Sequence, residues 1–184
     1  MFCFAPDTEI ATPEGPRAVK TLAPGDLVLK ADGRAVPMTW LGQMVTHRLF
    51  MPEEQFRPVR IAAGARPCGG PYADLMVTPD HGILVDGLLC SAGALVNGTT
   101  ITRVPMAELG QSETYWHVET AEREVLLANG APTASYLETR SVSHFTNRDA
   151  RPGAVMTEQP YPRAMSTRQV PPRVQNALAA RHCA

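Results

Sequence analysis

Turn signals recur along the first three quarters of this chain and leave room only for short strands between them. Asp32-Gly33, Asp86-Gly87, Asn97-Gly98 and Asn129-Gly130 are dipeptides that favour two-residue hairpin loops. The runs between such turns are short and apolar, and no long helical stripe interrupts them. Short strands separated by regular turns are typical of sandwiches and barrels, so the sequence predicts a closed or folded-over antiparallel all-β architecture.

The expected strands follow from alternation and from the turns that bound them. They cover residues 8–12, 17–19, 27–30, 37–42, 58–61, 75–78, 82–85, 99–102, 114–118 and 124–128. The last two are expected to face each other across a polar loop. We therefore assign residues 1–138 to one compact β domain.

Length and composition are those of a globular protein. The chain has 184 residues, of which 44% are hydrophobic and 19% are charged. No run approaches the roughly 18 apolar residues of a membrane span, so we do not expect the membrane as a partner. The start of the chain lacks a basic region followed by an apolar one, as a signal peptide would have. The cytoplasm is the default localisation, and secretion by a route without an N-terminal signal stays open.

The C-terminal residues differ in charge and in composition from the rest. Residues 1–139 carry 16 acidic and 10 basic side chains, whereas residues 140–184 carry seven Arg and two acidic residues. The second stretch is also rich in proline and has little apolar periodicity before Val174. Such a segment buries too little to offset its ordering entropy, so we expect 139–184 to be a mostly disordered, basic extension with one short helix within 174–182. Scattered Arg without interleaved aromatic residues indicates nucleic acid only weakly, and we do not expect it as a partner.

The four cysteines do not form a recognisable framework. Cys3, Cys68, Cys90 and Cys183 are far apart and include no C-x-x-C pair. This spacing argues against a zinc ribbon and against dense disulfides, and it favours free thiols in a reducing compartment. Cys90 is predicted to be a core thiol and Cys68 a loop thiol.

Three blocks of sequence resemble a known family when they are taken in order. The opening block is CFAPDTEIATPEG from Cys3, followed by LAPGDLVL from Leu22, and the middle block is LMVTPDHGILV from Leu75. The closing block runs from YWHVE at Tyr115 through EVLLANG to ASYLE, which ends at Glu138. Together they resemble the bacterial branch of the hedgehog/intein (Hint) family over residues 3–138. The resemblance implies a compact antiparallel β domain with a pseudo-two-fold horseshoe architecture.

The resemblance also implies a reaction of the chain on itself. In this family the first cysteine attacks the carbonyl of the preceding residue, so Cys3 would convert the Phe2–Cys3 amide to a thioester by an N-to-S acyl shift. Water or another nucleophile would then resolve the thioester. No cofactor and no metal is implied. The partner is an upstream polypeptide in cis, if the natural chain is longer, and the external nucleophile is unknown.

The Thr-x-x-His motif of the middle block supplies the expected helpers of Cys3. His81 would protonate the departing amine, because imidazole exchanges a proton near neutral pH. Thr78 would polarise the same peptide through its hydroxyl. Asp80 is a candidate to orient His81, although Pro-Asp is also ordinary turn chemistry. His117, in the closing block, is expected either to approach the site or to be a half-buried strand histidine.

The second half of protein splicing is not expected. Inteins end in a His-Asn pair, whereas alignment on Asn129-Gly130 puts Ala134-Ser135 at that place. A further family histidine falls near Arg123, and arginine cannot act as a base because it stays protonated. The sequence therefore favours cleavage at the N-terminal junction, or acyl transfer, over full splicing.

Three hypotheses about function stay open at this point. The first is a single-turnover autoprocessing domain, and the second is a catalytically decayed Hint module that serves as a structural or interaction domain. The third is a cysteine hydrolase that acts in trans through Cys3 and His81. A metal site made by Cys3, His81, His117 and Cys90 is a fourth arrangement that the ligand types allow.

Overall fold

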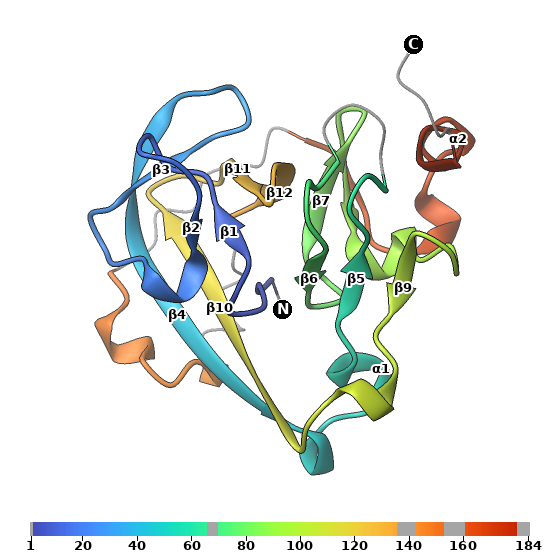
Figure 1. Cartoon of the computed structure of the whole chain (residues 1–184), viewed down its shortest axis with the longest axis horizontal. Coiled ribbons are helices and arrows are strands. Elements are labelled where there is room, and N and C mark those ends of the chain that lie inside the picture. Colours follow the sequence, from blue (N-terminus) through green and yellow to red (C-terminus); the bar gives the residue numbers. More distant parts are fainter. Residues whose placement is uncertain (1, 66–69, 136–142, 153–160, 180–184) are drawn as a thin grey trace.

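The computed structural model describes residues 2–65, 70–135, 143–152 and 161–179, and its strands form three sheets (Figure 1). The largest sheet contains, in spatial order, β13 (Arg163–Ala164), β8 (Leu88–Ser91), β7 (Gly82–Val85), β12 (Ala131–Ala134), β11 (Val125–Ala128), β1 (Glu9–Ile10) and β2 (Arg17–Ala18). A second sheet contains β10 (Ser112–Thr120), β4 (Ala35–His47) and β3 (Leu27–Leu29). The third contains β6 (Leu75–Val77), β5 (Val59–Ile61) and β9 (Ile101–Arg103). The predicted all-β class is confirmed.

Helices are few and short among the described residues. The two α-helices are α1 (Glu53–Phe56) and α2 (Pro172–Ala179). Short 3-10 turns cover Val19–Thr21, Arg48–Phe50, Ala92–Leu95, Met106–Glu108, Arg148–Ala150 and Thr167–Gln169. No helix in the described part of the chain is long and apolar enough to span a membrane.

Two of the predicted hairpin turns have the backbone geometry that their sequence favours. Asp86 and Asn129 have φ of 48° and 46°, and the glycines that come after them have φ of 74° and 80°. Positive φ at both central residues is the type I′ turn, whose twist matches that of paired strands. Asp86-Gly87 thus joins β7 to β8, and Asn129-Gly130 joins β11 to β12.

The predicted pairing of 114–118 with 124–128 is wrong. β10 pairs with β4 along its whole length, from Ser112 opposite His47 to Thr120 opposite Met38. β11 pairs instead with β12 and with β1. The reason is local, because the two-residue turn at Asn129-Gly130 folds β11 onto the next strand of the chain. β10 is then left to pair with a strand that is far away in sequence.

The N-terminal residues lie between two sheets, near the centre of the molecule (Figure 1). Phe4 forms antiparallel bridges with Trp116 of β10 on one side and with Val77 of β6 on the other. Its N–H donates to the Trp116 carbonyl at 2.7 Å, and its own carbonyl accepts from the Trp116 N–H at 2.9 Å. On the other side, the Ala5 N–H donates to the Met76 carbonyl at 3.0 Å. The segment that contains Cys3 is therefore held as an additional strand inside the domain.

The described part of the C-terminal extension is packed against the domain, which differs from the disorder expected for 139–184. Ala164, Val170 and Val174 are buried in the main core, and β13 pairs in parallel with β8. Phe145 is also buried, and its ring packs on Trp40 at a centroid distance of 5.1 Å. These few apolar side chains are buried against the domain, although the proline-rich composition of the segment as a whole predicted disorder. The expected helix within 174–182 corresponds to α2, which begins two residues earlier.

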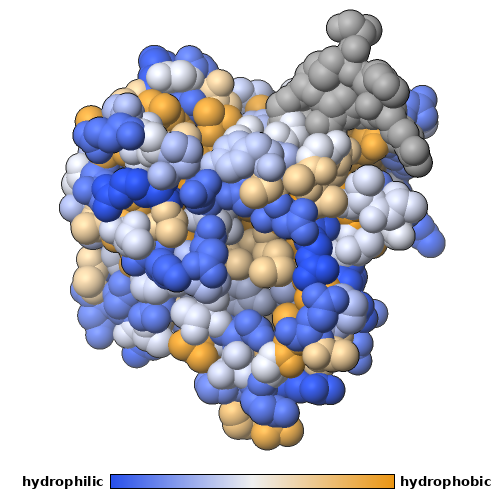
Figure 2. Space-filling view, in the orientation of Figure 1, coloured by the Kyte–Doolittle hydropathy of each residue, from blue (hydrophilic) through white to orange (hydrophobic). Residues whose placement is uncertain are grey.

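The surface in Figure 2 is mixed, with hydrophobic atoms gathered at the lower tip, where β4 ends. The 3-10 turn directly after β4 carries two strongly exposed apolar residues, Leu49 at 86% and Phe50 at 82% exposure. These residues contribute little to the core, so they provide a control for the buried aromatic residues.

We expect Phe145→Ala to lower the free energy of unfolding by about 3 kcal/mol, because it removes a buried ring and leaves a cavity against Trp40. The matched variant Phe50→Ala removes an exposed ring and should change that free energy by less than about 0.5 kcal/mol. Urea unfolding of both variants measures the difference. Equal stabilities would mean that residues 143–152 do not pack on the domain.

Candidate functional site

Cys3 lies in a buried, mostly apolar cluster beside the main core. Its side chain has no exposed surface, and it packs with Trp40, Met44, Tyr115 and Phe145. β4 supplies the first two of these neighbours and β10 supplies the third. The β4–β10 pairing thus builds most of the wall around the cysteine.

The peptide bond between Phe2 and Cys3 is held at both ends by side chains predicted for the site. The Cys3 N–H donates to Thr78 Oγ1 at 3.0 Å. The Phe2 carbonyl lies 2.5 Å from His117 Nδ1, and since a carbonyl only accepts, Nδ1 carries the proton and donates it. The Thr78 N–H also donates to the Cys3 carbonyl at 3.0 Å. The nitrogen and the oxygen of this one amide are therefore each bound by a side chain.

His81 lies beside the same peptide, between two phenylalanines. The ring centroid of Phe4 is 4.3 Å from that of His81, and the ring of Phe2 meets it edge-on at 6.4 Å. A turn orders the motif, in which the His81 N–H donates to the Thr78 carbonyl at 3.0 Å. Both ring nitrogens are buried without a hydrogen-bond partner. A buried imidazole in this state costs free energy, which the rest of the fold has to offset.

Burial keeps the ionisable groups of the site neutral. It raises the pKa of the Cys3 thiol to about 12. It lowers the pKa of His117 to about 4, against the opposing effect of the hydrogen bond to Phe2. Burial also lowers the pKa of His81 well below its ordinary value, with smaller effects of the same sign from His117 and Arg163. A protonated thiol and two neutral imidazoles therefore lie around the Phe2–Cys3 peptide at neutral pH.

Asp80 does not orient His81, contrary to one of the sequence interpretations. Its side chain is exposed, whereas the His81 ring nitrogens have no hydrogen-bond partner. Asp80 instead lines a pocket of about 280 Å³. The residues around this pocket are Met44, Thr46, Met51, Gln55, Thr78, Pro79, Asp80, Tyr115 and His144. Met44 and Tyr115 belong to the cluster around Cys3, and Thr78 accepts from the Cys3 N–H, so the pocket lies beside this cluster.

Two residues near the site were missed by sequence reasoning. Phe145 packs edge-on against His117 at 5.9 Å, and the Arg163 guanidinium lies 4.9 Å from the centre of the Phe2 ring. Both belong to the segment that was expected to be disordered. In the sequence these are one isolated aromatic residue and one of several scattered arginines, and neither pattern predicts that the residue lies near Cys3.

The four residues considered as a metal site do not form one. In the described residues, no three His, Cys, Asp or Glu side chains gather closely enough to hold a metal ion. Cys90 lies in the main core with no exposed surface, as predicted, and Cys3 lies in the separate cluster.

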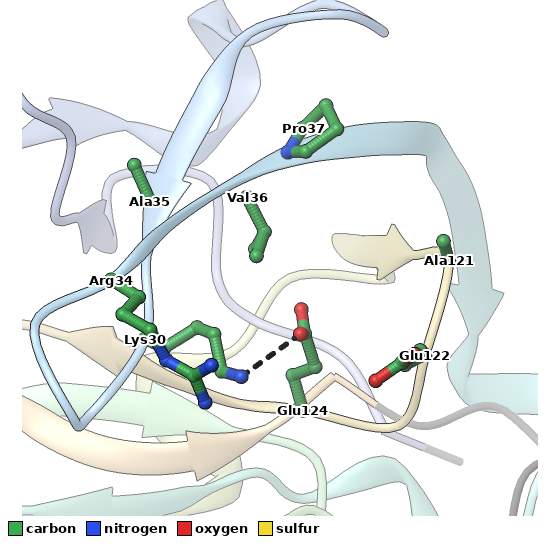
Figure 3. A pocket seen from close by; sticks show the side chains of 8 residues that line it. All are labelled: Lys30, Arg34, Ala35, Val36, Pro37, Ala121, Glu122 and Glu124. Atoms are coloured by element: carbon green, nitrogen blue, oxygen red, sulfur yellow. Dashed lines mark ion pairs between the residues drawn. The ribbon is translucent and has the colours of Figure 1, made fainter.

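A second pocket, of about 370 Å³, lies between the β3–β4 hairpin and the loop before β11 (Figure 3). Lys30 and Glu124 point toward each other there, and their Nζ and Oε1 atoms form an ion pair at 3.1 Å. Arg34 and Glu122 add one further charge of each sign. The pocket shares no lining residue with the cluster around Cys3, and its charges balance, so it does not compete as the reactive site.

Comparisons with known proteins agree with the fold. Residues 2–140 match the family model of the Hint domain. The chain belongs to the Hint domain family. No curated protein sequence matches it.

Solved intein structures are similar to this Hint chain in fold. The MchDnaB-1 intein is 18% identical with a TM-score of 0.52, over 71% of this chain and 98% of the intein. A DnaB intein from Synechocystis sp. PCC 6803 is 9% identical with a TM-score of 0.52, over 73% of this chain and 99% of that one. At such identities the similarity shows a shared fold and leaves the activity to be argued from the site.

We expect the stability of the domain to fall as the pH is lowered from 6.5 toward 4. An unfolded histidine has a pKa near 6.5, whereas the folded His117 has one of about 4, so unfolding takes up a proton in this range. The stability that neutral His117 provides is complete above pH 6.5 and is lost as the pH falls through this range. The pKa of His81 is shifted in the same direction, so a second proton adds to the loss.

Urea unfolding at pH 7.5 and 5.0 measures this loss. His117→Gln should reduce it by about 2 kcal/mol, because that variant takes up one proton fewer on unfolding. His47→Gln, at an exposed histidine, is the control and should behave as the unchanged chain does. An identical pH dependence in all three proteins would show that His117 is not buried in its neutral form.

Proposed function

We propose that this chain is a self-processing Hint domain that breaks its own Phe2–Cys3 peptide through a thioester. The observation that carries the proposal is the pair of hydrogen bonds on that peptide, from Cys3 N–H to Thr78 and from His117 Nδ1–H to the Phe2 carbonyl. Any buried backbone carbonyl needs a hydrogen-bond donor, and at Phe2 that donor is an imidazole side chain. An acyl shift also needs such a donor, because negative charge develops on that oxygen.

The reaction exchanges one bond for another. The Cys3 sulfur bonds to the carbonyl carbon of Phe2, and the carbon–nitrogen bond to Cys3 breaks. The thiol proton is finally carried by the new α-amine of Cys3. His117 stabilises the oxygen of the tetrahedral intermediate, and neutral His81, beside the same peptide, transfers the proton from sulfur to nitrogen. Thr78 fixes the nitrogen, so that its lone pair can take that proton.

The main barrier is the protonated thiol. With a pKa raised to about 12, Cys3 holds almost no thiolate at neutral pH, so proton removal and attack must occur together. Two features compensate. The nucleophile and the carbonyl belong to adjacent residues, and well-oriented intramolecular reactions reach effective molarities of roughly 10⁵–10⁸ M. The low dielectric of the site also strengthens the hydrogen bond from His117 to the developing oxyanion.

The pocket beside Thr78 is the proposed entrance for the group that resolves the thioester. Its 280 Å³ are sufficient for water or for a small nucleophile, and its walls include Met44 and Tyr115 from the cluster around Cys3. Attack by water gives a carboxylate on the upstream segment and returns the free thiol of Cys3. The partner in this scheme is an upstream polypeptide in cis.

We do not propose full splicing. Ser135, at the place of the terminal asparagine of inteins, is buried and hydrogen-bonded to the Glu124 N–H and to Thr120 Oγ1, each at 3.1 Å. A serine has no amide that could cyclise. A hydrolase acting in trans is not proposed either, because a foreign chain has no access to a side chain with no exposed surface.

The alternative is a Hint module that keeps the fold and lacks the reaction. The raised pKa of Cys3 favours this alternative, because a fully buried thiol is a poor nucleophile. The two functions differ in one observable, which is whether an upstream segment is released.

A stable reporter protein joined upstream of Phe2 should be released by cleavage at the Phe2–Cys3 bond. Dithiothreitol or hydroxylamine should accelerate its release, because each attacks a thioester and neither attacks an amide under mild conditions. Cys3→Ala should abolish it, and His117→Ala should slow it by roughly 10²- to 10³-fold, as loss of an oxyanion donor does. Intact mass over hours measures the product. His47→Ala is the control, and an uncut, folded fusion would instead establish the inactive module.

Two variants of Thr78 distinguish the effect of its hydrogen bond to the Cys3 nitrogen from the effect of its packing. Thr78→Val keeps the shape and removes the oxygen that accepts from the Cys3 N–H, so we expect release to slow by about tenfold. Thr78→Ser keeps the oxygen and should retain most of the rate. The same intact-mass measurement compares both variants with the unchanged chain. If Thr78→Val releases the reporter as fast as the unchanged chain does, the Thr78 hydroxyl has no part in the mechanism.

A further inference from the structure

The part of the chain beyond residue 140, which the Hint family model does not match, reaches the reactive peptide at two points. Phe145 completes the cluster around Cys3 and contacts the His117 ring. Arg163 lies over the ring of Phe2, the residue whose carbonyl is attacked. Two separate described segments of the extension therefore contact the two residues of the bond to be broken.

Arg163 is anchored to the same hairpin that begins beside His81. It forms β13 with Ala164, and this strand pairs in parallel with β8, Arg163 opposite Leu89. The Leu89 N–H also donates to the Pro162 carbonyl at 2.9 Å. β8 pairs in turn with β7, which starts at the residue after His81. The backbone that carries the guanidinium is thus fixed relative to the site.

The Phe2 ring is enclosed between an imidazole and a cation. It is 4% exposed, with the edge-on ring of His81 6.4 Å away and the Arg163 guanidinium 4.9 Å from its centre. A guanidinium at this distance attracts the negative face of an aromatic ring, most strongly where water is excluded. Arg163 also helps to lower the pKa of His81, in agreement with its position near both rings.

We propose that Arg163 is a positioning residue for self-cleavage and makes the site prefer an aromatic residue immediately before Cys3. This inference rests on the proposed function. The ring and the carbonyl of Phe2 belong to one residue, so a cation that fixes the ring also limits rotation of the carbonyl away from His117 Nδ1. An aliphatic side chain at this position offers no π face, so Arg163 cannot hold it in the same way.

The test is a substrate preference measured in the full chain fused to an upstream reporter. Cleavage rates are compared for Phe2 and for Phe2→Leu, each with Arg163, with Arg163→Met and with Arg163→Lys. The quantity compared is the cleavage rate with Phe2 divided by the rate with Phe2→Leu. We expect this ratio to be roughly 5- to 10-fold higher with Arg163 than with Arg163→Met. Arg163→Lys, which keeps a cation, should restore part of the preference. Arg168→Met, at an exposed arginine of the same segment, is the control and should keep the full preference.

The ratio of the two rates identifies which idea fails. A residue that only supports the fold would slow phenylalanine and leucine equally, so an unchanged ratio in Arg163→Met overturns the positioning role even if both rates fall. If the fusion with Phe2 and Arg163 is folded and is never cut, the proposed function itself fails, and the positioning role fails with it. Cleavage without a preference for phenylalanine leaves the proposed function intact and overturns only the role of Arg163.

Discussion

The structure depends on the backbone hydrogen bonds that hold the N-terminal residues between β6 and β10. Phe4 pairs with Trp116 on one side, while Ala5 and the Cys3 carbonyl bind the β6 side through Met76 and Thr78. Without this inserted segment, two sheets would present unpaired backbone groups to the interior, at a cost comparable to a lost hydrogen bond for each group. The same bonds fix the Phe2–Cys3 peptide to within the tolerance that hydrogen bonds allow. The same hydrogen bonds therefore both stabilise the fold and place the Phe2–Cys3 peptide.

This constraint explains why sequence reasoning recovers some features and misses others. Turn chemistry is local, so Asp86-Gly87 and Asn129-Gly130 were found from two residues each and have the expected geometry. The pairing of β4 with β10 joins residues about 65 to 80 positions apart and carries no local signal, since many strands alternate as these do. Cys3 comes from the N-terminal segment, Thr78 follows β6 and His117 lies on β10, and only the resemblance of whole blocks pointed to all three.

The misses at the C-terminus have a different cause. Composition predicts whether a segment can bury enough surface by itself, and the segment from 139 onward cannot. It does not predict whether a few apolar side chains fit places already formed by another domain, as Phe145 does beside Trp40 and Val174 does in the main core. Asp80 shows a similar limit, because adjacency in sequence does not by itself bring one side chain to the ring of the next. Burial separates them, His81 being enclosed and Asp80 exposed.

The enclosure of Cys3 has two opposite consequences for chemistry. Burial raises the pKa of the thiol and so suppresses the nucleophile, yet it also excludes bulk water and foreign substrates from the sulfur. An enzyme that must release product and bind again could not tolerate such a site. A domain that acts once, on a bond already inside it, needs no path for substrate and needs only a path for the small group that finishes the reaction. The arrangement of a sealed thiol beside a 280 Å³ pocket fits the second case.

The close approach of Ala134 to Gly82, whose added Cβ would lie 3.2 Å from that of Ala134, shows that the end of β12 still reaches the residue after His81. The family match ends at residue 140, and the described part of the extension beyond it packs onto the domain.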